Sequence, residues 1–133
     1  MKVAACKYPV GRPADFAAFA DKQRRLLGEA ASLGARVAVL PEYLSLELAA
    51  LFPPFQAALR ACLAAMRSVR GDWLGRFAGI ARDTGMYVVA GSFLLAQAGG
   101  RYRNRSDLFA PGGGHLWQDK LQLTGFEKAV GVI

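Results

Sequence analysis

Residues that bind metals or form disulfides are scarce in this 133-residue sequence, which contains one histidine, His115, and two cysteines, Cys6 and Cys62. Their spacing matches no metal-ligand motif, because metal sites need closely spaced clusters of such residues. Two cysteines are too few for a disulfide framework, so we expect buried free thiols in a reducing compartment. The sequence therefore predicts a cytoplasmic protein that uses neither a metal nor a cofactor.

Long hydrophobic runs are absent as well. No apolar run reaches the ~18 residues that a membrane-spanning helix requires. The short apolar stretch that follows Met1 and Lys2 is interrupted by Lys7, so it does not resemble a signal peptide. We expect no association with a membrane.

Acidic residues are few: the sequence has 10 aspartates and glutamates and 17 lysines and arginines, which gives a net charge of +7. The basic residues are spread along the chain, and only residues 101–105 form a local cluster. A nucleic-acid interface usually concentrates positive charge on one face or helix. The pattern favours a solvated basic surface, and we expect no nucleic-acid partner, since that hypothesis rests on net charge alone.

Apolar residues, in contrast, make up 53% of the sequence, and the mean hydropathy is +0.20. This composition excludes a disordered chain, and the length suits one domain over residues 1–133. A chain of this size buries roughly two thirds of its unfolded surface. The apolar content exceeds what such a domain needs for its own core, which indicates a large interface or a missing partner half.

The first 40 residues have the pattern of a strand, a helix and a second strand. Lys2–Tyr8 is mostly apolar and predicts a strand, and Asp15 is a suitable N-cap for a helix that begins at Phe16. Gly34 can end this helix in a left-handed conformation. Val37–Leu40 is apolar at every position, as is typical of a buried parallel strand. The two strands should therefore be parallel, with the helix as a right-handed crossover.

The remaining sequence predicts two further helices and three strands, and hence an α/β fold with a mixed sheet. Asp72 is a candidate N-cap for the later helix, and strands are expected at Met86–Phe93, Tyr102–Ala110 and His115–Leu121. The glycines between the last two strands favour a hairpin over a phosphate loop, because no Lys-Ser/Thr pair or helix follows. His115, without a carboxylate at a telling spacing, should be a surface residue at a strand end. The face of the first of these helices should consist of Phe55, Leu59, Cys62, Leu63 and Met66.

The segment after Val37–Leu40 has the strongest functional signal. Pro41 cannot donate to a sheet ladder, so it should end the strand, and Glu42 follows directly. The carboxyl ends of strands are where open α/β sheets place their ligand sites. A carboxylate at that position is costly unless it is paired or functional, and a plain ion pair remains the alternative.

Residues 39–43 (VLPEY), together with residues 118–127 (QDKLQLTGFE), resemble motifs of the nitrilase superfamily of carbon–nitrogen hydrolases. The order of the expected helices and strands between these motifs, with Asn104 and the glycine-rich hairpin, is also similar to that family. The resemblance extends over the whole chain. It implies an αββα sandwich, of which this chain is one half, with helices on one face of the sheet.

The resemblance also implies a Glu-Lys-Cys triad, with Glu42 as the general base, Lys120 as the lysine and Glu127 as a supporting glutamate. The residue types suit that chemistry, because a cysteine needs a nearby base to become a thiolate. A fixed ammonium group would stabilise the negative charge that develops during attack on an amide or nitrile carbon. The acyl-enzyme would be a thioester. The expected substrates are small amides, carbamoyl compounds or nitriles.

The nucleophilic cysteine of that family should follow Lys120, but no cysteine lies beyond Cys62. We therefore expect this chain to be the amino-terminal part of such an enzyme, a partial domain that is inactive alone. The alternative is a non-catalytic truncated paralogue that binds a ligand or pairs with another subunit. Half a sandwich leaves an apolar sheet face open, so we expect copies to associate through it.

Overall fold

The computed structural model describes residues 1–52 and 59–133, which fold into helices packed on a six-stranded mixed sheet. The strands pair in the order β1-β2-β3-β5-β4. Strands β3 and β4 pair with successive parts of one edge of β5, and β6 pairs with its other edge. Strands β1, β2 and β3 are parallel, whereas β5 is antiparallel to β3, β4 and β6. The strands are β1 (Val3–Ala5), β2 (Val37–Val39), β3 (Tyr87–Val89), β4 (Phe93–Ala96), β5 (Tyr102–Phe109) and β6 (His115–Asp119).

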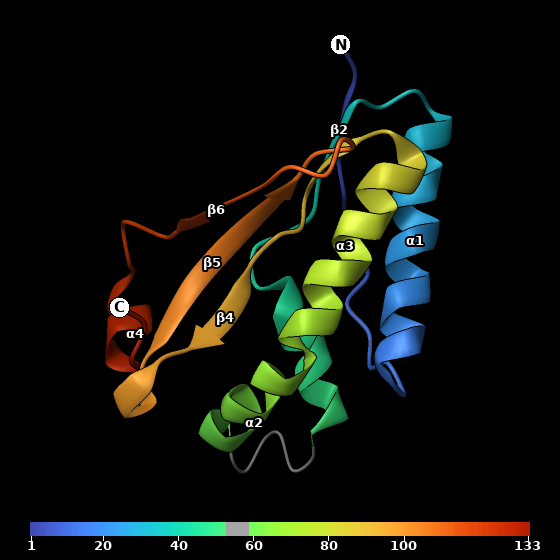
Figure 1. The fold of residues 1–133 in the computed structure, drawn as a ribbon. Coiled ribbons are helices and arrows are strands. Elements are labelled where there is room, and N and C mark those ends of the chain that lie inside the picture. The colour runs from blue at the N-terminus through green and yellow to red at the C-terminus, as the bar shows by residue number, and fades with distance from the viewer. Residues whose placement is uncertain (53–58) are drawn as a thin grey trace.

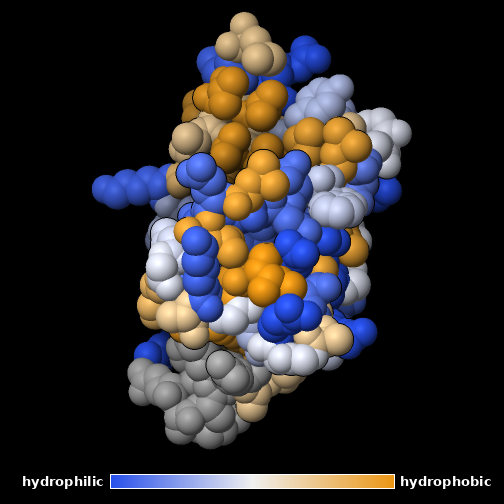
Figure 2. Space-filling view, turned by 90° about the vertical axis from the view of Figure 1, so that its left-hand side faces the viewer, coloured by the Kyte–Doolittle hydropathy of each residue, from blue (hydrophilic) through white to orange (hydrophobic). Residues whose placement is uncertain are grey.

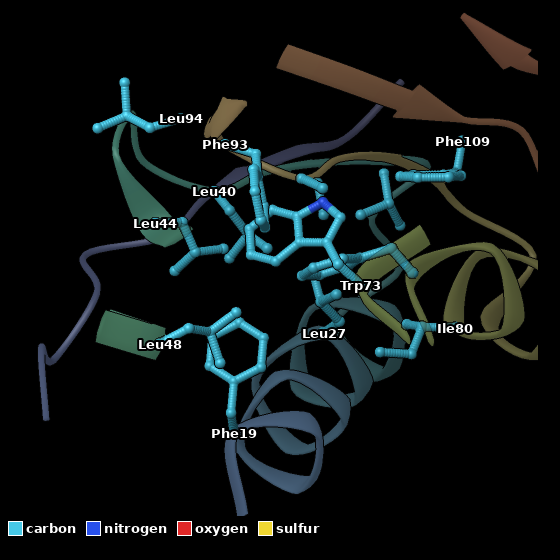
Figure 3. Packing of buried hydrophobic residues seen from close by; sticks show 14 of the residues in the cluster. Phe19, Leu27, Leu40, Leu44, Leu48, Trp73, Ile80, Phe93, Leu94 and Phe109 are labelled. Atoms are coloured by element: carbon cyan, nitrogen blue, oxygen red, sulfur yellow. The ribbon is translucent and has the colours of Figure 1, made fainter. Parts of the chain in front are cut away.

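The two long helices, α1 and α3, lie side by side on one face of this sheet (Figure 1). The core between the helices and the sheet contains stacked and edge-on aromatic rings from both layers, among them Phe19, Trp73 and Phe93 (Figure 3). The α/β class with helices on one face is therefore confirmed. The helical segments are α1 (Phe16–Ser32), η1 (Leu44–Leu51), α2 (Leu59–Ala65), η2 (Met66–Val69), α3 (Arg70–Thr84), η3 (Ala98–Gly100) and α4 (Gly125–Ala129).

The βαβ unit at the start of the chain is confirmed. The Asp15 side chain accepts a hydrogen bond from the Ala18 backbone N–H at 2.7 Å, as an N-cap does. Gly34, just past the end of α1, has φ +83°, a conformation that a side chain would disfavour. Strand β1 is shorter than Lys2–Tyr8, because the chain leaves the sheet and Tyr8 donates its hydroxyl proton to Glu47 Oε1 at 2.7 Å.

The start of α3 differs from the expected one. Asp72 is not the N-cap of α3, because η2 runs directly into α3 and the cap residue is Val69. Asp72 lies instead in the first turn, where a carboxylate is favourable near the positive end of the helix dipole. On the preceding helix, Cys62, Leu63 and Met66 are buried as predicted, whereas Phe55 lies outside the described residues.

The single strand predicted at Met86–Phe93 is not continuous, because this segment forms two strands, β3 and β4, that pair with successive parts of the same edge of β5. Strand β3 pairs with β2 and β5, and β4 pairs only with β5. The break is at Gly91, whose φ of +64° is incompatible with an extended ladder. The local sequence looks continuous, so only the pairing with β5 reveals this break.

His115 is an exposed residue at the start of β6, as predicted, but it has a carboxylate partner, which the sequence did not indicate. Its ring stacks on Phe109 with centroids 4.8 Å apart, and its Nε2 lies 3.0 Å from Asp107 Oδ1 across the hairpin. Asp107 is only 1% exposed and is held from the helix layer by both terminal guanidinium nitrogens of Arg70, at 2.7 and 2.9 Å. A buried carboxylate therefore joins the hairpin to α3.

The sheet face opposite the helices is apolar and partly exposed. The strand register places Val37 between Val3 and Tyr87, and Val39 between Ala5 and Val89. Exposed apolar side chains on these strands include Val3, Val39 and Tyr87. Figure 2 shows this side of the molecule, where apolar side chains gather in the upper part of the view. No helix within residues 1–52 and 59–133 is long and apolar enough to cross a bilayer.

Candidate active site

Glu42 lies where the sequence predicts, in the turn just beyond β2. Leu40 makes the last ladder bond, from its N–H to the Val89 carbonyl at 3.0 Å, and Pro41 has no N–H with which to continue. Tyr43 then takes a left-handed conformation with φ +61°. This costly conformation is held by the Ser92 hydroxyl, which accepts a hydrogen bond from the Tyr43 N–H at 2.8 Å.

Gly91 allows the β3–β4 connection to pass close to this turn. A Cβ atom at Gly91 would lie 2.1 Å from the Pro41 carbonyl oxygen and 3.0 Å from Leu44 Cβ. Both contacts are with atoms that cannot move away freely, so only glycine fits. The backbone that carries Glu42 is therefore supported by a neighbouring strand connection.

We expect Gly91→Ala to lower the free energy of unfolding by about 2–4 kcal/mol, because the Cβ clashes and φ is positive. The measurement is urea unfolding of wild type and variant. Gly99→Ala is the matched control, since Gly99 has φ +72° but no atom within 4 Å of the position that a Cβ would occupy. It should cost only about 1 kcal/mol. Equal losses in the two variants would show that the close approach to Pro41 is not what requires glycine.

Lys120 connects two carboxylates. It follows β6, and its backbone N–H donates to the Asn104 carbonyl on β5 at 2.9 Å. Its Nζ lies 2.9 Å from Glu42 Oε1 and 3.1 Å from Glu127 Oε1. Hydrogen bonds to these two carboxylates, that to Glu42 first, raise the pKa of Lys120 above its usual range. The side chain is therefore positively charged at neutral pH.

Glu127 is a fixed anion beside this lysine. Together with Thr124 it forms the capping box of α4, and its Oε2 accepts bonds from the Thr124 N–H at 2.8 Å and the Thr124 hydroxyl at 3.0 Å. The Tyr43 hydroxyl donates to its Oε1. Hydrogen bonds, that from Tyr43 first, lower the pKa of Glu127 to about 2. Because the side chain is only 3% exposed and stays ionised, it suits the positioning of Lys120.

Tyr43 is the partner that keeps Glu127 in place. Burial, followed by the hydrogen bond to Glu127, raises the pKa of Tyr43 to about 12. The phenol is therefore a hydrogen-bond donor at neutral pH. It links the turn that carries Glu42 to the helix that carries Glu127.

The two carboxylates differ in exposure. The Glu42 side chain is 49% exposed, whereas that of Glu127 is 3% exposed. Glu42 is thus the more accessible of the two carboxylates, and Glu127 is buried against Lys120. Neither Cys6 nor Cys62 hydrogen-bonds to this group within the described residues, and the Cys62 thiol donates instead to the Phe52 carbonyl at 2.7 Å.

The structure brings together all three site residues singled out in the sequence: Glu42, Lys120 and Glu127. Sequence reasoning gave no role to Tyr43 or Asn104, although both lie within or between the quoted motifs. The capping-box pattern, Thr at position 124 followed three residues later by Glu, was a local signal for the placement of Glu127. No local signal exists for the contact of Asn104, because its partners are distant in sequence.

Comparisons with known proteins agree with this arrangement. Residues 2–129 match the family model for carbon–nitrogen hydrolases. The fold is similar to that of an amidase from Nesterenkonia sp., with 23% identity and a TM-score of 0.63 over 98% of this chain and 46% of that one. It is also similar to a mutant of the amidase from Nesterenkonia sp. AN1 that shows covalent addition of the acetamide moiety of fluoroacetamide at its active-site cysteine, with 25% identity, a TM-score of 0.62 and coverage of 98% and 47%.

This chain therefore spans less than half the length of those amidases. Another structure of that amidase, a cysteine-to-serine mutant described as belonging to the nitrilase superfamily, gives a TM-score of 0.63 at 23% identity, with coverage of 98% and 47%. No curated protein matches the sequence. Because the family model covers nearly all of the residues, the resemblance to the nitrilase superfamily is confirmed, and the chain belongs to the carbon–nitrogen hydrolase family.

Proposed function

We propose that the protein containing this chain hydrolyses a carbon–nitrogen bond of a small amide, carbamoyl compound or nitrile through a Glu-Lys-Cys mechanism. The observation that carries the proposal is the placement of Lys120 Nζ between Glu42 Oε1, at 2.9 Å, and Glu127 Oε1, at 3.1 Å. A plain surface ion pair would not need a second, buried carboxylate, a capping box and a tyrosine to hold the lysine. The family assignment supports the same chemistry.

In the proposed reaction of an amide, Glu42 accepts the proton of a cysteine thiol, and the thiolate attacks the carbonyl carbon. Lys120 stabilises the negative charge that develops on the oxygen. The proton on Glu42 passes to the departing amine as the C–N bond breaks, which leaves a thioester. Glu42 then accepts a proton from water as the water oxygen attacks the thioester carbon. The carboxylic acid is released, and the proton passes from Glu42 to the cysteine sulfur, which regenerates the thiol.

We propose that the nucleophilic cysteine lies outside these 133 residues. Two observations support this: neither Cys6 nor Cys62 hydrogen-bonds to the charged group within the described residues, and the amidases are about twice as long as this chain. One of those amidases has its covalent adduct on an active-site cysteine. The 133-residue chain alone is accordingly proposed to be inactive.

The test is release of ammonia by the full-length protein from short aliphatic amides, carbamoyl compounds and nitriles. Release from at least one class, abolished by prior alkylation of its thiols, supports the proposal. Comparison of the three classes identifies the substrate type. A full-length protein that releases no ammonia from any of them, although folded, would overturn it in favour of the non-catalytic alternative.

The exposed apolar sheet face favours association between copies of this chain. We propose that copies of the isolated chain associate through this face, on which Val39 and Tyr87 are exposed. Val39→Lys should increase the monomer fraction in sedimentation equilibrium, because it places a charge within the proposed contact. Leu33→Lys is the control, since Leu33 is exposed at the end of α1, away from the sheet. A wild-type chain that stays monomeric at high concentration would contradict this proposal.

A further inference from the structure

Asn104 lies at the centre of the charged group, although nothing in the motifs assigns it a role. It is on β5, is 3% exposed, and its carbonyl accepts the backbone hydrogen bond of Lys120. Its side-chain Nδ2 donates to Glu42 Oε1 at 2.8 Å and lies 3.4 Å from Glu127 Oε1. One residue thus contacts both carboxylates and positions the backbone of the lysine between them.

The chemistry of this position favours an amide. Two carboxylates and one lysine leave one negative charge in excess, so a neutral donor helps to hold the carboxylates together without a new charge. The Asn104 Oδ1 atom is buried and has no hydrogen-bond partner among the described residues. Such an atom is costly to bury, so packing alone does not explain the residue, and the donated hydrogen bonds offset that cost.

These contacts make the two oxygens of Glu42 unequal. Oε1 accepts hydrogen bonds from both Lys120 and Asn104. Oε2 receives no hydrogen bond from residues 1–52 or 59–133, and the side chain is half exposed. One oxygen is therefore anchored by two donors, and the other is free of hydrogen bonds from the described residues.

We propose that Asn104 is a positioning residue that anchors Glu42 through Oε1, so that Oε2 is the oxygen that accepts the proton of the nucleophile. This inference rests on the proposed hydrolase function. It extends that function by naming the oxygen of Glu42 that reacts and the residue that fixes the orientation of the carboxylate. General-base catalysis depends on the position of the base, because a displacement of a reacting group by about 1 Å can reduce the rate by about 100-fold.

The first test is kinetic and uses the full-length protein. Asn104→Leu should lower kcat by about 10- to 100-fold with less than about a twofold change in KM, because binding is retained while the base is misdirected. Ser106→Ala is the matched control: Ser106 lies two residues further along β5, and its side chain makes no hydrogen bond to the three charged residues. An Asn104→Leu protein with wild-type kcat would overturn the inference while leaving the proposed function intact.

The second variant, Asn104→Asp, keeps the shape of the side chain and removes the donor when ionised. The ratio of its kcat to that of wild type should rise as pH is lowered, because a protonated aspartate can donate to Glu42 again. A purely structural role would give a ratio independent of pH, and that result would contradict the inference. This variant also tests the positioning role of Asn104 if the Asn104→Leu protein does not fold.

A third readout does not depend on activity. In NMR spectra of the same protein, three-bond couplings should show one side-chain rotamer for Glu42 in wild type and averaging among rotamers in Asn104→Asp at neutral pH. If wild type released no ammonia, the proposed function would fail, and the couplings would still test whether Asn104 fixes Glu42. Equal couplings in the two proteins would overturn the positioning role.

Discussion

Glu42→Gln should lower kcat for amide hydrolysis by the full-length protein by about 100- to 10,000-fold, the contribution typical of a general base. Glutamine has the same shape, and its carbonyl oxygen can still accept the hydrogen bonds from Lys120 and Asn104. It cannot accept the thiol proton at neutral pH. We therefore expect KM and the unfolding midpoint to change little while kcat falls.

The measurement is steady-state ammonia release, with circular dichroism to check the fold. Glu29→Gln is the matched control, because Glu29 is an exposed glutamate on α1 that forms an ion pair only with Arg25, at 3.5 Å, among the described residues. It should retain full activity. A Glu42→Gln protein with more than half of the wild-type kcat would show that Glu42 is not the base.

Arg70→Met should lower the free energy of unfolding by about 3–5 kcal/mol, the largest effect on stability that we expect from one substitution. It removes both guanidinium contacts from Asp107, which is 1% exposed, and leaves a buried carboxylate with His115 as its remaining side-chain partner among the described residues. Urea unfolding measures the loss. The physical reason is desolvation, since a buried charge without its partner cannot recover its hydration.

Two further variants separate this explanation from lost packing. Arg82→Met removes an exposed ion pair with Asp83, whose atoms lie 3.6 Å apart, and should change stability by less than about 0.5 kcal/mol. The double variant Arg70→Met/Asp107→Leu should recover much of the stability, because no charge then remains buried. A double variant as unstable as Arg70→Met would show that the buried charge is not the cause of the loss.

The charged site illustrates how local and long-range signals differ. Glu42 could be predicted because Pro41 ends a strand of apolar residues, and each step of that reasoning involves neighbours in sequence. Lys120 and Glu127 were predicted from the motif that they share. The structure adds the reason for the motif, since the capping box fixes Glu127 and the hairpin brings Lys120 to it.

The features that could not be predicted depend on contacts between distant residues. Residues 86–93 look like one strand, and the break at Gly91 lies against the turn after β2, whose Pro41 carbonyl oxygen would be 2.1 Å from a Cβ at Gly91. Arg70 and Asp107 are 37 residues apart, and no local pattern pairs them. Asn104 is similar, because its contact with Glu42 spans 62 residues. Local propensity predicts the secondary structure of each segment but not the distant segment that it contacts.

We propose, above all, that this chain supplies the base and the lysine of a hydrolase whose nucleophile lies elsewhere in the same protein. The most direct test is the intact mass of the natural protein, combined with mapping of the cysteine that a thiol-alkylating reagent labels as amidase activity is lost. We predict a mass roughly twice 14.3 kDa and a labelled cysteine outside residues 1–133. A natural protein of 14.3 kDa, or loss of activity that follows labelling of Cys6 or Cys62, would contradict this proposal.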